Sequence, residues 1–144
     1  MSVEYAAGLF DGEGCVLFYY SAGRITCGLN LSNCDSRALY FMQDMFGGRV
    51  RQTEKAGKRG KVHAMGIWEV TGEEAEIAAM SMLPHSILKR EQLSLFLEAR
   101  SRCFNNVNGK RAGGKLTKRD RIRRTHYAKL IADLKRPVLV MGVK

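Results

Sequence analysis

The segment AAGLFDGEG, residues 6–14, constrains the fold of this chain more than any other part of its sequence. Residues 3–11 are rich in alanine, leucine and phenylalanine, and glycines follow at positions 12 and 14, so the pattern predicts a short helix with a glycine-rich end. Gly8 and Gly12 lie one helical turn apart, beside two alanines, which leaves one side of the helix almost without side chains. Another backbone can therefore approach this side closely.

Two carboxylates, Asp11 and Glu13, lie at the end of this helix. The helix macrodipole disfavours a negative charge there by about 0.3–1 kcal/mol each, so local stability does not explain them. If a second copy of the helix packed against the glycine side, two copies of Glu13 would lie close together. Such carboxylates repel each other unless a divalent cation lies between them, where they form a hard-oxygen site for Mg²⁺. This arrangement suits two-metal hydrolysis of a phosphodiester.

Two β-hairpins are predicted after this helix. The first pairs residues 15–20 with 24–32, and the second pairs 49–53 with 62–70. Alternation gives each hairpin one polar face, and an uncovered polar face with few acids favours contact with a polyanion. Arginine can then pair with guanine, and asparagine with adenine. The residues expected on this polar face are Arg24, Thr26, Asn30, Arg49, Arg51, Thr53, His63 and Met65.

Helices are predicted between and after the hairpins. Asp35 or Ser36 can cap a helix that ends near Phe46, before two glycines. After the second hairpin the pattern predicts helices over residues 73–82 and 87–104, interrupted by Pro84, with Leu88, Phe96 and Ala99 among the apolar residues of the second. Thr117 can cap a last helix that runs to about residue 135. With 144 residues, 45% of them hydrophobic, the chain is expected to form one compact unit without internal repeats.

The charge of the chain is strongly positive. It carries 24 lysines and arginines against 14 acids, a net charge of +10, and residues 110–136 hold eleven of the bases and only two acids. A surplus of this size favours a polyanionic partner, although charge alone does not distinguish DNA from RNA or an anionic membrane. We expect the basic segment to pack on the core or to extend it.

Several protein classes do not fit the sequence. The four cysteines match neither a zinc site nor a small disulfide scaffold, and we expect them to be reduced. No apolar run approaches the ~20 residues that a membrane span requires, and no secretory signal is visible. We therefore expect a soluble intracellular protein, in the cytoplasm of a bacterium or phage-infected cell or in an organelle matrix, that is neither secreted nor bound to a membrane.

The segment AAGLFDGEG resembles the LAGLIDADG motif of homing endonucleases. Five positions match, whereas Ala6 replaces the leading leucine and Glu13 replaces the last acid; the matching residues are Ala7, Gly8, Leu9, Asp11 and Gly14. The order of the predicted elements also resembles this family over about residues 3–104. The resemblance implies an α+β fold in the order αββαββα, with a four-stranded antiparallel saddle that straddles DNA. Residues 1–104 would form the endonuclease core, and residues 105–144 a basic linker and an additional C-terminal helix.

The resemblance also implies roles for individual residues. In this family the last acid of the motif binds the catalytic metal, which assigns Glu13, with Gly12, to the metal site and gives Asp11 a supporting part. Residues 84–92, PHSILKREQ, resemble the stretch that carries the active-site lysine, so Lys89 takes its place and can stabilise charge on the scissile phosphate. Asn33 stands where family members carry a residue that positions water, and Arg37 where a basic residue neighbours the phosphate.

A single motif supplies one helix and one acid, whereas the saddle needs two of each. We therefore expect a homodimer that cleaves both strands of a long palindromic or pseudo-palindromic double-stranded DNA target as a Mg²⁺-dependent endodeoxyribonuclease. Mn²⁺ or Ca²⁺ could occupy the site, with Ca²⁺ not supporting cleavage. The residues expected at the dimer interface are Ala7, Gly8, Asp11 and Gly12. Two alternatives of the same fold stay open, namely a maturase that binds its host intron RNA and a non-cleaving DNA-binding regulator.

Overall fold

The computed structural model describes residues 2–22, 24–56, 62–104 and 117–136. The helices and strands, in chain order, are α1 (Val3–Glu13), β1 (Gly14–Ser21), β2 (Arg24–Asn33), α2 (Ser36–Phe46), β3 (Arg49–Ala56), β4 (Val62–Thr71), α3 (Gly72–Met82), the short 3₁₀ helix η1 (Leu83–His85), α4 (Arg90–Phe104) and α5 (Lys118–Leu134). This order confirms the predicted α+β class and the αββαββα arrangement with an additional C-terminal helix. The predicted glycine-rich link after residue 104 lies outside the described residues.

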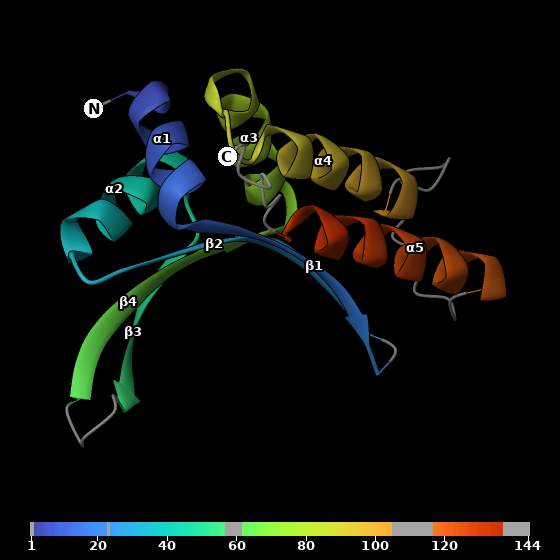
Figure 1. The fold of residues 1–144 in the computed structure, drawn as a ribbon, viewed down its shortest axis with the longest axis horizontal. Helices are drawn as coiled ribbons and strands as arrows, with labels where there is room; N and C mark the ends of the chain where they lie inside the picture. The colour runs from blue at the N-terminus through green and yellow to red at the C-terminus, as the bar shows by residue number, and fades with distance from the viewer. Residues whose placement is uncertain (1, 23, 57–61, 105–116, 137–144) are drawn as a thin grey trace, which may run out of the picture.

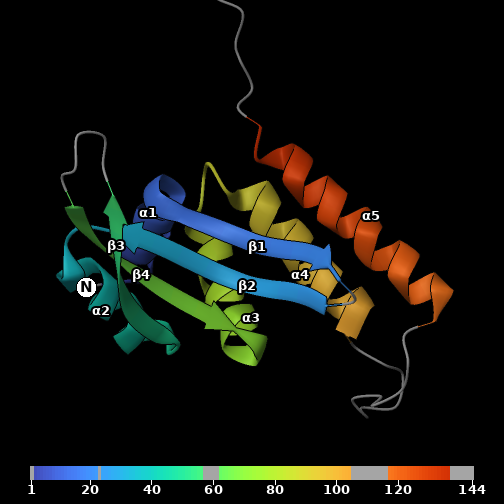
Figure 2. The same ribbon diagram turned by 90° about the horizontal axis from the view of Figure 1, so that it is seen from below.

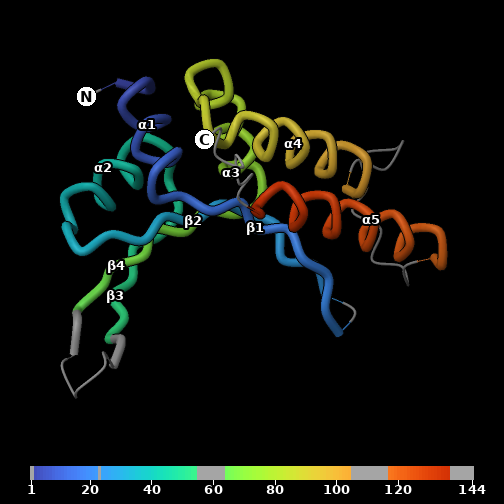
Figure 3. The backbone as a smooth tube through the Cα atoms, viewed as in Figure 1, coloured from blue at the N-terminus to red at the C-terminus, as the bar shows by residue number. Residues whose placement is uncertain are grey.

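The four strands form one antiparallel sheet in the order β1-β2-β4-β3. The sheet is bent into an arch, and all the helices lie on its convex side (Figures 1 and 3). Seen from below, the strands lie in front of the helices, so none of the described helices lies on the concave side (Figure 2). The fold therefore has two layers, one of helices and one of strands, with the concave face of the sheet left uncovered.

The alternation of the strands decides which residues face the helices. Val16 lies opposite Leu29, and Leu31 lies opposite Trp68, and all four side chains are buried between the sheet and the helices. Because strand side chains alternate between faces, the neighbours of these residues lie on the concave side. The register confirms the polar face that the sequence predicts.

The turn between α2 and β3 depends on two glycines. Gly47 and Gly48 have φ values of 74° and 79°, a region that residues with a Cβ atom rarely adopt. The carbonyl of Gly47 accepts a hydrogen bond of 2.9 Å from the indole Nε1 of Trp68, and a Cβ atom on Gly48 would lie 2.5 Å from the carbonyl oxygen of Glu69. This turn ends α2 and brings β3 alongside β4.

Two helix boundaries differ from the prediction. Helix α1 continues past Asp11 to Glu13, because the N–H of Gly14 still donates to the carbonyl of Phe10. Helix α4 begins at Arg90 and not at residue 87, so the prediction that Leu88 contributes to the apolar side of this helix was wrong. Leu88 instead lies before the helix with 73% of its surface exposed. The contacts of Asp11, given below, account for the late start of α4.

Helix α5 packs beside α4 and the edge strand β1 (Figures 1 and 2). Its first turn is closed by a capping box, in which the Thr117 hydroxyl accepts from the N–H of Asp120 and the Asp120 carboxylate accepts from the N–H of Thr117. Tyr127 and Ile131 are buried against the core. None of the helices in the described ranges has the length and apolar character of a membrane span.

Candidate metal site and nucleic-acid interface

The Asp11 carboxylate is buried and accepts hydrogen bonds from four donors. Its side chain is only 9% exposed and meets the segment that links η1 to α4. The N–H groups of Ile87, Leu88 and Lys89 donate to it at 2.6, 3.1 and 3.0 Å, and the hydroxyl of Ser86 is the fourth donor. Burial raises the pKa of the Asp11 carboxyl, but the four hydrogen bonds outweigh burial and hold this pKa below its usual value.

These hydrogen bonds explain why α4 starts late. The three N–H groups before Arg90 point at a carboxylate from α1, as the free N–H groups at a helix start require. The negative charge of Asp11 lies at the start of α4, where the macrodipole favours it. Asp11 therefore joins the end of α1 to the start of α4.

The side chain of Lys89 reaches the end of the same helix. Its Nζ donates to the backbone carbonyl of Asp11 at 3.0 Å. A cation at a helix C-terminus is favourable because it meets carbonyls that have no partner inside the helix. The structure thus brings Lys89 within two residues of Glu13, although the two lie far apart in the sequence.

Glu13 is the last residue of α1, and its side chain is exposed. The end of α1 leads directly into β1 near the top of the arch (Figures 1 and 3). An exposed carboxylate beside the carbonyls of a helix C-terminus offers the oxygen ligands that Mg²⁺ prefers. Within the described ranges no three His, Cys, Asp or Glu side chains gather into a metal site. Glu13 and Gly12 therefore stay the predicted metal-binding residues of one protomer.

The open side of α1 is smaller than the predicted interface. Gly8 and Gly12 are exposed, and a Cβ atom added to either would meet nothing within 4 Å. Ala7, in contrast, is 0% exposed and Asp11 faces α4, so these two residues of the predicted dimer interface have their side chains against their own protomer. In a helix, residues 7 and 11 lie about 100° away from residues 8 and 12, which turns them toward the core of their own protomer.

Asn33 and Arg37 both form contacts at the start of α2. The Asn33 Oδ1 accepts from the N–H of Asp35 at 2.8 Å. The Arg37 guanidinium donates to both oxygens of Asp35, at 2.6 Å to Oδ2 and 3.0 Å to Oδ1, and these hydrogen bonds lower the pKa of Asp35 to about 2. The Arg37 side chain remains 89% exposed. Both side chains therefore have local partners, and only the Nδ2 of Asn33 and the outer edge of Arg37 are available to a ligand.

Two arginines on the concave face form ion pairs with the same glutamate. Arg49 and Arg51 both lie on β3, and their Nη2 atoms lie 3.2 and 3.6 Å from the Oε2 of Glu69 on β4. Their side chains remain 73% and 54% exposed. Glu69 holds the two guanidinium groups in place while leaving most of their surface open. Glu69 itself is only 17% exposed, so it lies where it can orient both arginines.

The other predicted contact residues follow the same register. Asn30 lies opposite Glu69, and Thr53 lies opposite Met65 and donates from its hydroxyl to the Met65 carbonyl at 3.1 Å. Arg24 and Thr26 lie on the same face, at the start of β2. His63 pairs with Lys55 through the backbone, and its side chain lies outside the described residues. The structure thus brings the predicted residues that it describes to one surface.

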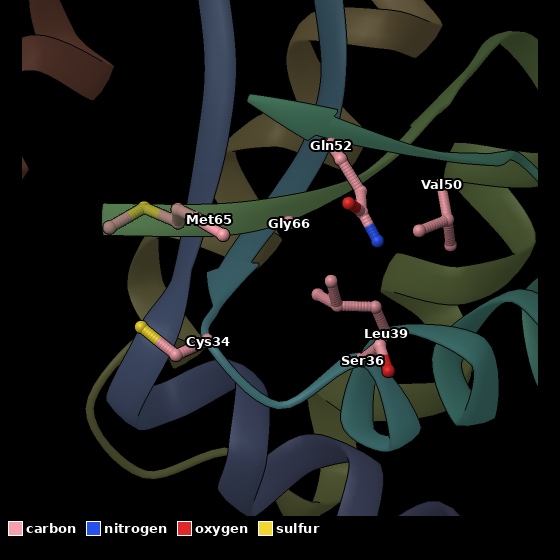
Figure 4. Close-up of a pocket in the computed structure, with 8 residues that line it drawn as sticks. Cys34, Ser36, Leu39, Val50, Gln52, Met65 and Gly66 are labelled. Carbon is pink, nitrogen blue, oxygen red and sulfur yellow. The ribbon is translucent and has the colours of Figure 1, made fainter. Parts of the chain in front are cut away.

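A small pocket lies on the other side of the sheet and does not belong to this surface. It has a volume of about 50 Å³ and lies between the start of α2 and strands β3 and β4, with Leu39 and Gln52 directed toward it (Figure 4). A space of this size holds at most a water molecule or two.

Several arginines of the basic C-terminal segment have partners within the chain. Arg123 and Arg124 of α5 donate to the carbonyls of Arg102 and Cys103 at 3.1 and 3.3 Å, which caps the end of α4. The guanidinium of Arg124 also lies over the ring of Phe104, 5.1 Å from its centroid. These two arginines serve the packing of α5, so part of the positive charge in this segment is structural.

Two residues of the site were not predicted from the sequence. Glu69 could have been found, because it alternates with Trp68 and Val70 and so lies on the concave face. Ser86 gave no such signal, since its partner Asp11 is 75 residues away and the contact depends on the packing of α1 against η1.

Comparison with solved structures finds proteins of the same fold. The homing endonuclease I-CvuI, in complex with its target in the presence of 2 mM Ca, matches with a TM-score of 0.69 and 20% sequence identity, over 95% of this chain and 86% of that one. The same enzyme with the I-CreI target and 2 mM Mg, in which the DNA is not cleaved, matches with a TM-score of 0.63 and 18% identity, again over 95% and 86%. No known family profile and no curated protein matches the sequence. The chain has the LAGLIDADG homing endonuclease fold.

Proposed function

We propose that this chain is a site-specific homing endonuclease. As a homodimer it makes a double-strand break in a long palindromic or pseudo-palindromic DNA target by metal-dependent hydrolysis. The observation that carries the proposal is that Lys89 donates to the Asp11 carbonyl near the end of α1, the helix end at which Glu13 is exposed. The proposal is supported by the similarity of this fold to that of I-CvuI, a homing endonuclease whose structure was solved in complex with its DNA target.

The homodimer is proposed from the open side of α1. Gly8 and Gly12 present bare backbone, and Tyr5, one turn before Gly8, is 52% exposed. Ile87 and Leu88, beside the end of α1, are 81% and 73% exposed. A second copy of α1 packed on this side would cover the bare backbone and the tyrosine. It would also supply the second Glu13 that one protomer lacks.

Glu13 and the Gly12 carbonyl from each protomer are the proposed ligands of Mg²⁺. When bound, Mg²⁺ supplies the Lewis acid that hydrolysis of a phosphodiester needs. Mn²⁺ could replace it, whereas Ca²⁺ is expected to support binding without cleavage. The oxygen-only donor set fits hard cations of this kind better than zinc or copper.

Lys89 is proposed to act on the scissile phosphate. Its ammonium lies at the end of α1, held by the Asp11 carbonyl, so it can stabilise negative charge that develops on the phosphate. The Nδ2 of Asn33 is proposed to orient the attacking water, because the Oδ1 of the same amide is occupied by Asp35. Arg37 is proposed to lie beside the phosphate backbone of the DNA, with the part of its guanidinium that does not bind Asp35 directed at the phosphates.

The concave face is proposed to read the DNA bases in the major groove. Arg49 and Arg51, oriented by Glu69, can each pair with a guanine through two hydrogen bonds, and Asn30 can pair with an adenine. Arg24, Thr26, Thr53, Met65 and His63 are proposed to complete this contact surface. Because a two-fold dimer repeats the surface, the target is expected to consist of two similar half-sites.

The proposal is tested by selecting cleaved sequences from a randomised palindromic DNA library. In Mg²⁺ the chain should enrich one family of palindromic targets, and in Ca²⁺ it should bind the selected target without cutting it. Gel shifts with the selected DNA and with structured RNA are run alongside. Tight RNA binding without any enriched cleavage site would favour a maturase, and DNA binding without cleavage in Mg²⁺ or Mn²⁺ would favour a regulator. Either result would contradict the nuclease proposal.

A further inference from the structure

Ser86 lies completely buried at the contact between α1 and the start of α4. Its side chain is 0% exposed, and its hydroxyl donates to the Oδ1 atom of Asp11. The same Oδ1 atom accepts the N–H of Lys89 at 3.0 Å. A hydroxyl placed inside the protein without a partner would destabilise it, so its direction toward this one oxygen is fixed.

Lys89 is tied to Asp11 at two points. Its backbone N–H donates to the Asp11 carboxylate, and its Nζ donates to the Asp11 carbonyl at 3.0 Å. The backbone and the side chain of Lys89 therefore both bind to the same residue of α1. Glu13 follows two residues later on the same helix, so these two hydrogen bonds set where the ammonium lies relative to the Glu13 carboxylate.

We propose that Ser86 is a positioning residue for Lys89. Its hydroxyl fixes the Asp11 oxygen that holds the Lys89 backbone, and so it holds the Lys89 ammonium at the end of α1. Ser86 touches neither the DNA nor a metal in this account. Its kinetic role rests on the proposed nuclease function, whereas its effect on the position of Lys89 does not.

The Arg90 side chain also binds the backbone around Ser86. The carbonyl of Ser86 accepts from the Nε of Arg90 at 3.0 Å, and the Nη2 of Arg90 donates to the carbonyl of Pro84 at 3.2 Å. We therefore expect the backbone around Ser86 to keep its conformation when only the Ser86 hydroxyl is removed. Ser86→Ala is expected to loosen the Asp11 oxygen without unfolding the segment, which makes it a suitable test.

The kinetic test compares Ser86→Ala, Lys89→Ala and the double variant in single-turnover cleavage at saturating DNA. Ser86→Ala should slow cleavage about tenfold, because small displacements of a catalytic group have effects of this order. The affinity for DNA in Ca²⁺ should stay within about twofold, since Ser86 acts only through Lys89 in this account. In the Lys89→Ala background, Ser86→Ala should cause no further loss. Equal losses in both backgrounds would overturn the proposal, because a residue with a purely structural role acts independently of Lys89.

Two variants serve as controls. Ser81→Ala removes a comparable hydroxyl, which donates to the Ile77 carbonyl at 2.8 Å on α3, and it should leave the cleavage rate unchanged. Ser86→Thr keeps the hydroxyl and should cleave close to the wild-type rate. A Ser86→Thr chain with a wild-type melting temperature that cleaves as slowly as Ser86→Ala would contradict the proposal.

A second measurement does not depend on cleavage. The rate at which an amine-reactive reagent modifies Lys89 is followed by mass spectrometry, with exposed Lys129 as an internal reference. Ser86→Ala should raise the Lys89 rate about fivefold, the factor that corresponds to losing one typical hydrogen bond, and leave Lys129 unchanged. An unchanged Lys89 rate would overturn the positioning role. If the wild-type chain does not cleave DNA, the nuclease proposal has failed, and this measurement still decides whether Ser86 positions Lys89.

Discussion

The two sides of α1 place two carboxylates, two residues apart, in opposite environments. On the closed side, Asp11 is 9% exposed and accepts from four donors of the segment before α4. On the open side, Glu13 is exposed, and Gly8 and Gly12 leave the helix backbone bare. One acid of the motif is therefore satisfied within its own protomer, whereas the other is exposed, as a ligand of a cation or of a second copy of the chain must be.

The largest effect on folding is expected on the closed side. Asp11→Ala would leave the Ser86 hydroxyl and three N–H groups without their acceptor, and it should lower the free energy of unfolding by about 3 kcal/mol. Glu13→Ala is the matched control on the open side and should change it by no more than about 0.5 kcal/mol. Urea denaturation at one fixed protein concentration measures both. Similar losses in the two variants would remove the distinction between the two sides.

The next effect separates folding from dimerisation. Ala7→Leu inserts a large side chain at a position that is 0% exposed, and overpacking should lower the stability of the protomer by about 1–3 kcal/mol. Gly8→Leu meets nothing within 4 Å in the protomer and should leave it folded, but should prevent a second α1 from approaching. Analytical ultracentrifugation should show dimers for the wild-type chain and folded monomers for Gly8→Leu. Dimers that persist in Gly8→Leu would place the interface elsewhere.

The next effect is expected on the concave face and concerns base discrimination, not folding. In the proposed dimer, packing of two α1 helices would place the concave faces of the two copies side by side. Arg51→Ala should weaken discrimination at one base position in each half-site by about 1–3 kcal/mol. Arg123→Ala is a control of the same charge, and because Arg123 caps α4 it should leave the base preference unchanged. Binding to all single-base variants of the selected target measures this. A uniform loss at every position would indicate that Arg51 contacts only phosphates.

The smallest effect concerns Glu69, which orients both arginines of β3. Glu69→Gln removes the charge that holds Arg49 and Arg51, and exposed ion pairs contribute about 1 kcal/mol or less. DNA affinity should therefore rise slightly or stay constant, whereas base discrimination should fall. A large loss of stability in this variant would show that the ion pairs hold the sheet together.

The sequence predicted the elements and the concave face well, because both follow from local periodicity. Alternation along residues 24–33 and 49–53 was sufficient to place Arg24, Asn30 and Arg51 on one face, and the pairing register agrees. The resemblance to the LAGLIDADG motif selected Glu13 and Lys89, and the structure brings both to the end of α1.

The predictions that were wrong or incomplete concern residues whose structure depends on contacts between segments far apart in the sequence. Apolar residues at 87 and 88 suggested that α4 starts there, but their N–H groups bind Asp11, which lies 76 and 77 residues earlier. Ala7 belongs to the motif and was expected at the interface, yet the packing of α1 on its own core buries it. Arg124 was counted only as positive charge, whereas its partner is a carbonyl of α4.

The central claim is that Glu13 binds the metal that cleavage requires. It is tested most directly with a plasmid that carries one selected target, incubated in Mg²⁺ with the wild-type chain or with Glu13→Gln, while DNA binding is measured in Ca²⁺. We expect linear plasmid from the wild-type chain and no linear plasmid from Glu13→Gln, at equal DNA affinity, because the change removes a metal ligand and no DNA contact. Linear plasmid formed by Glu13→Gln at the wild-type rate would contradict the claim.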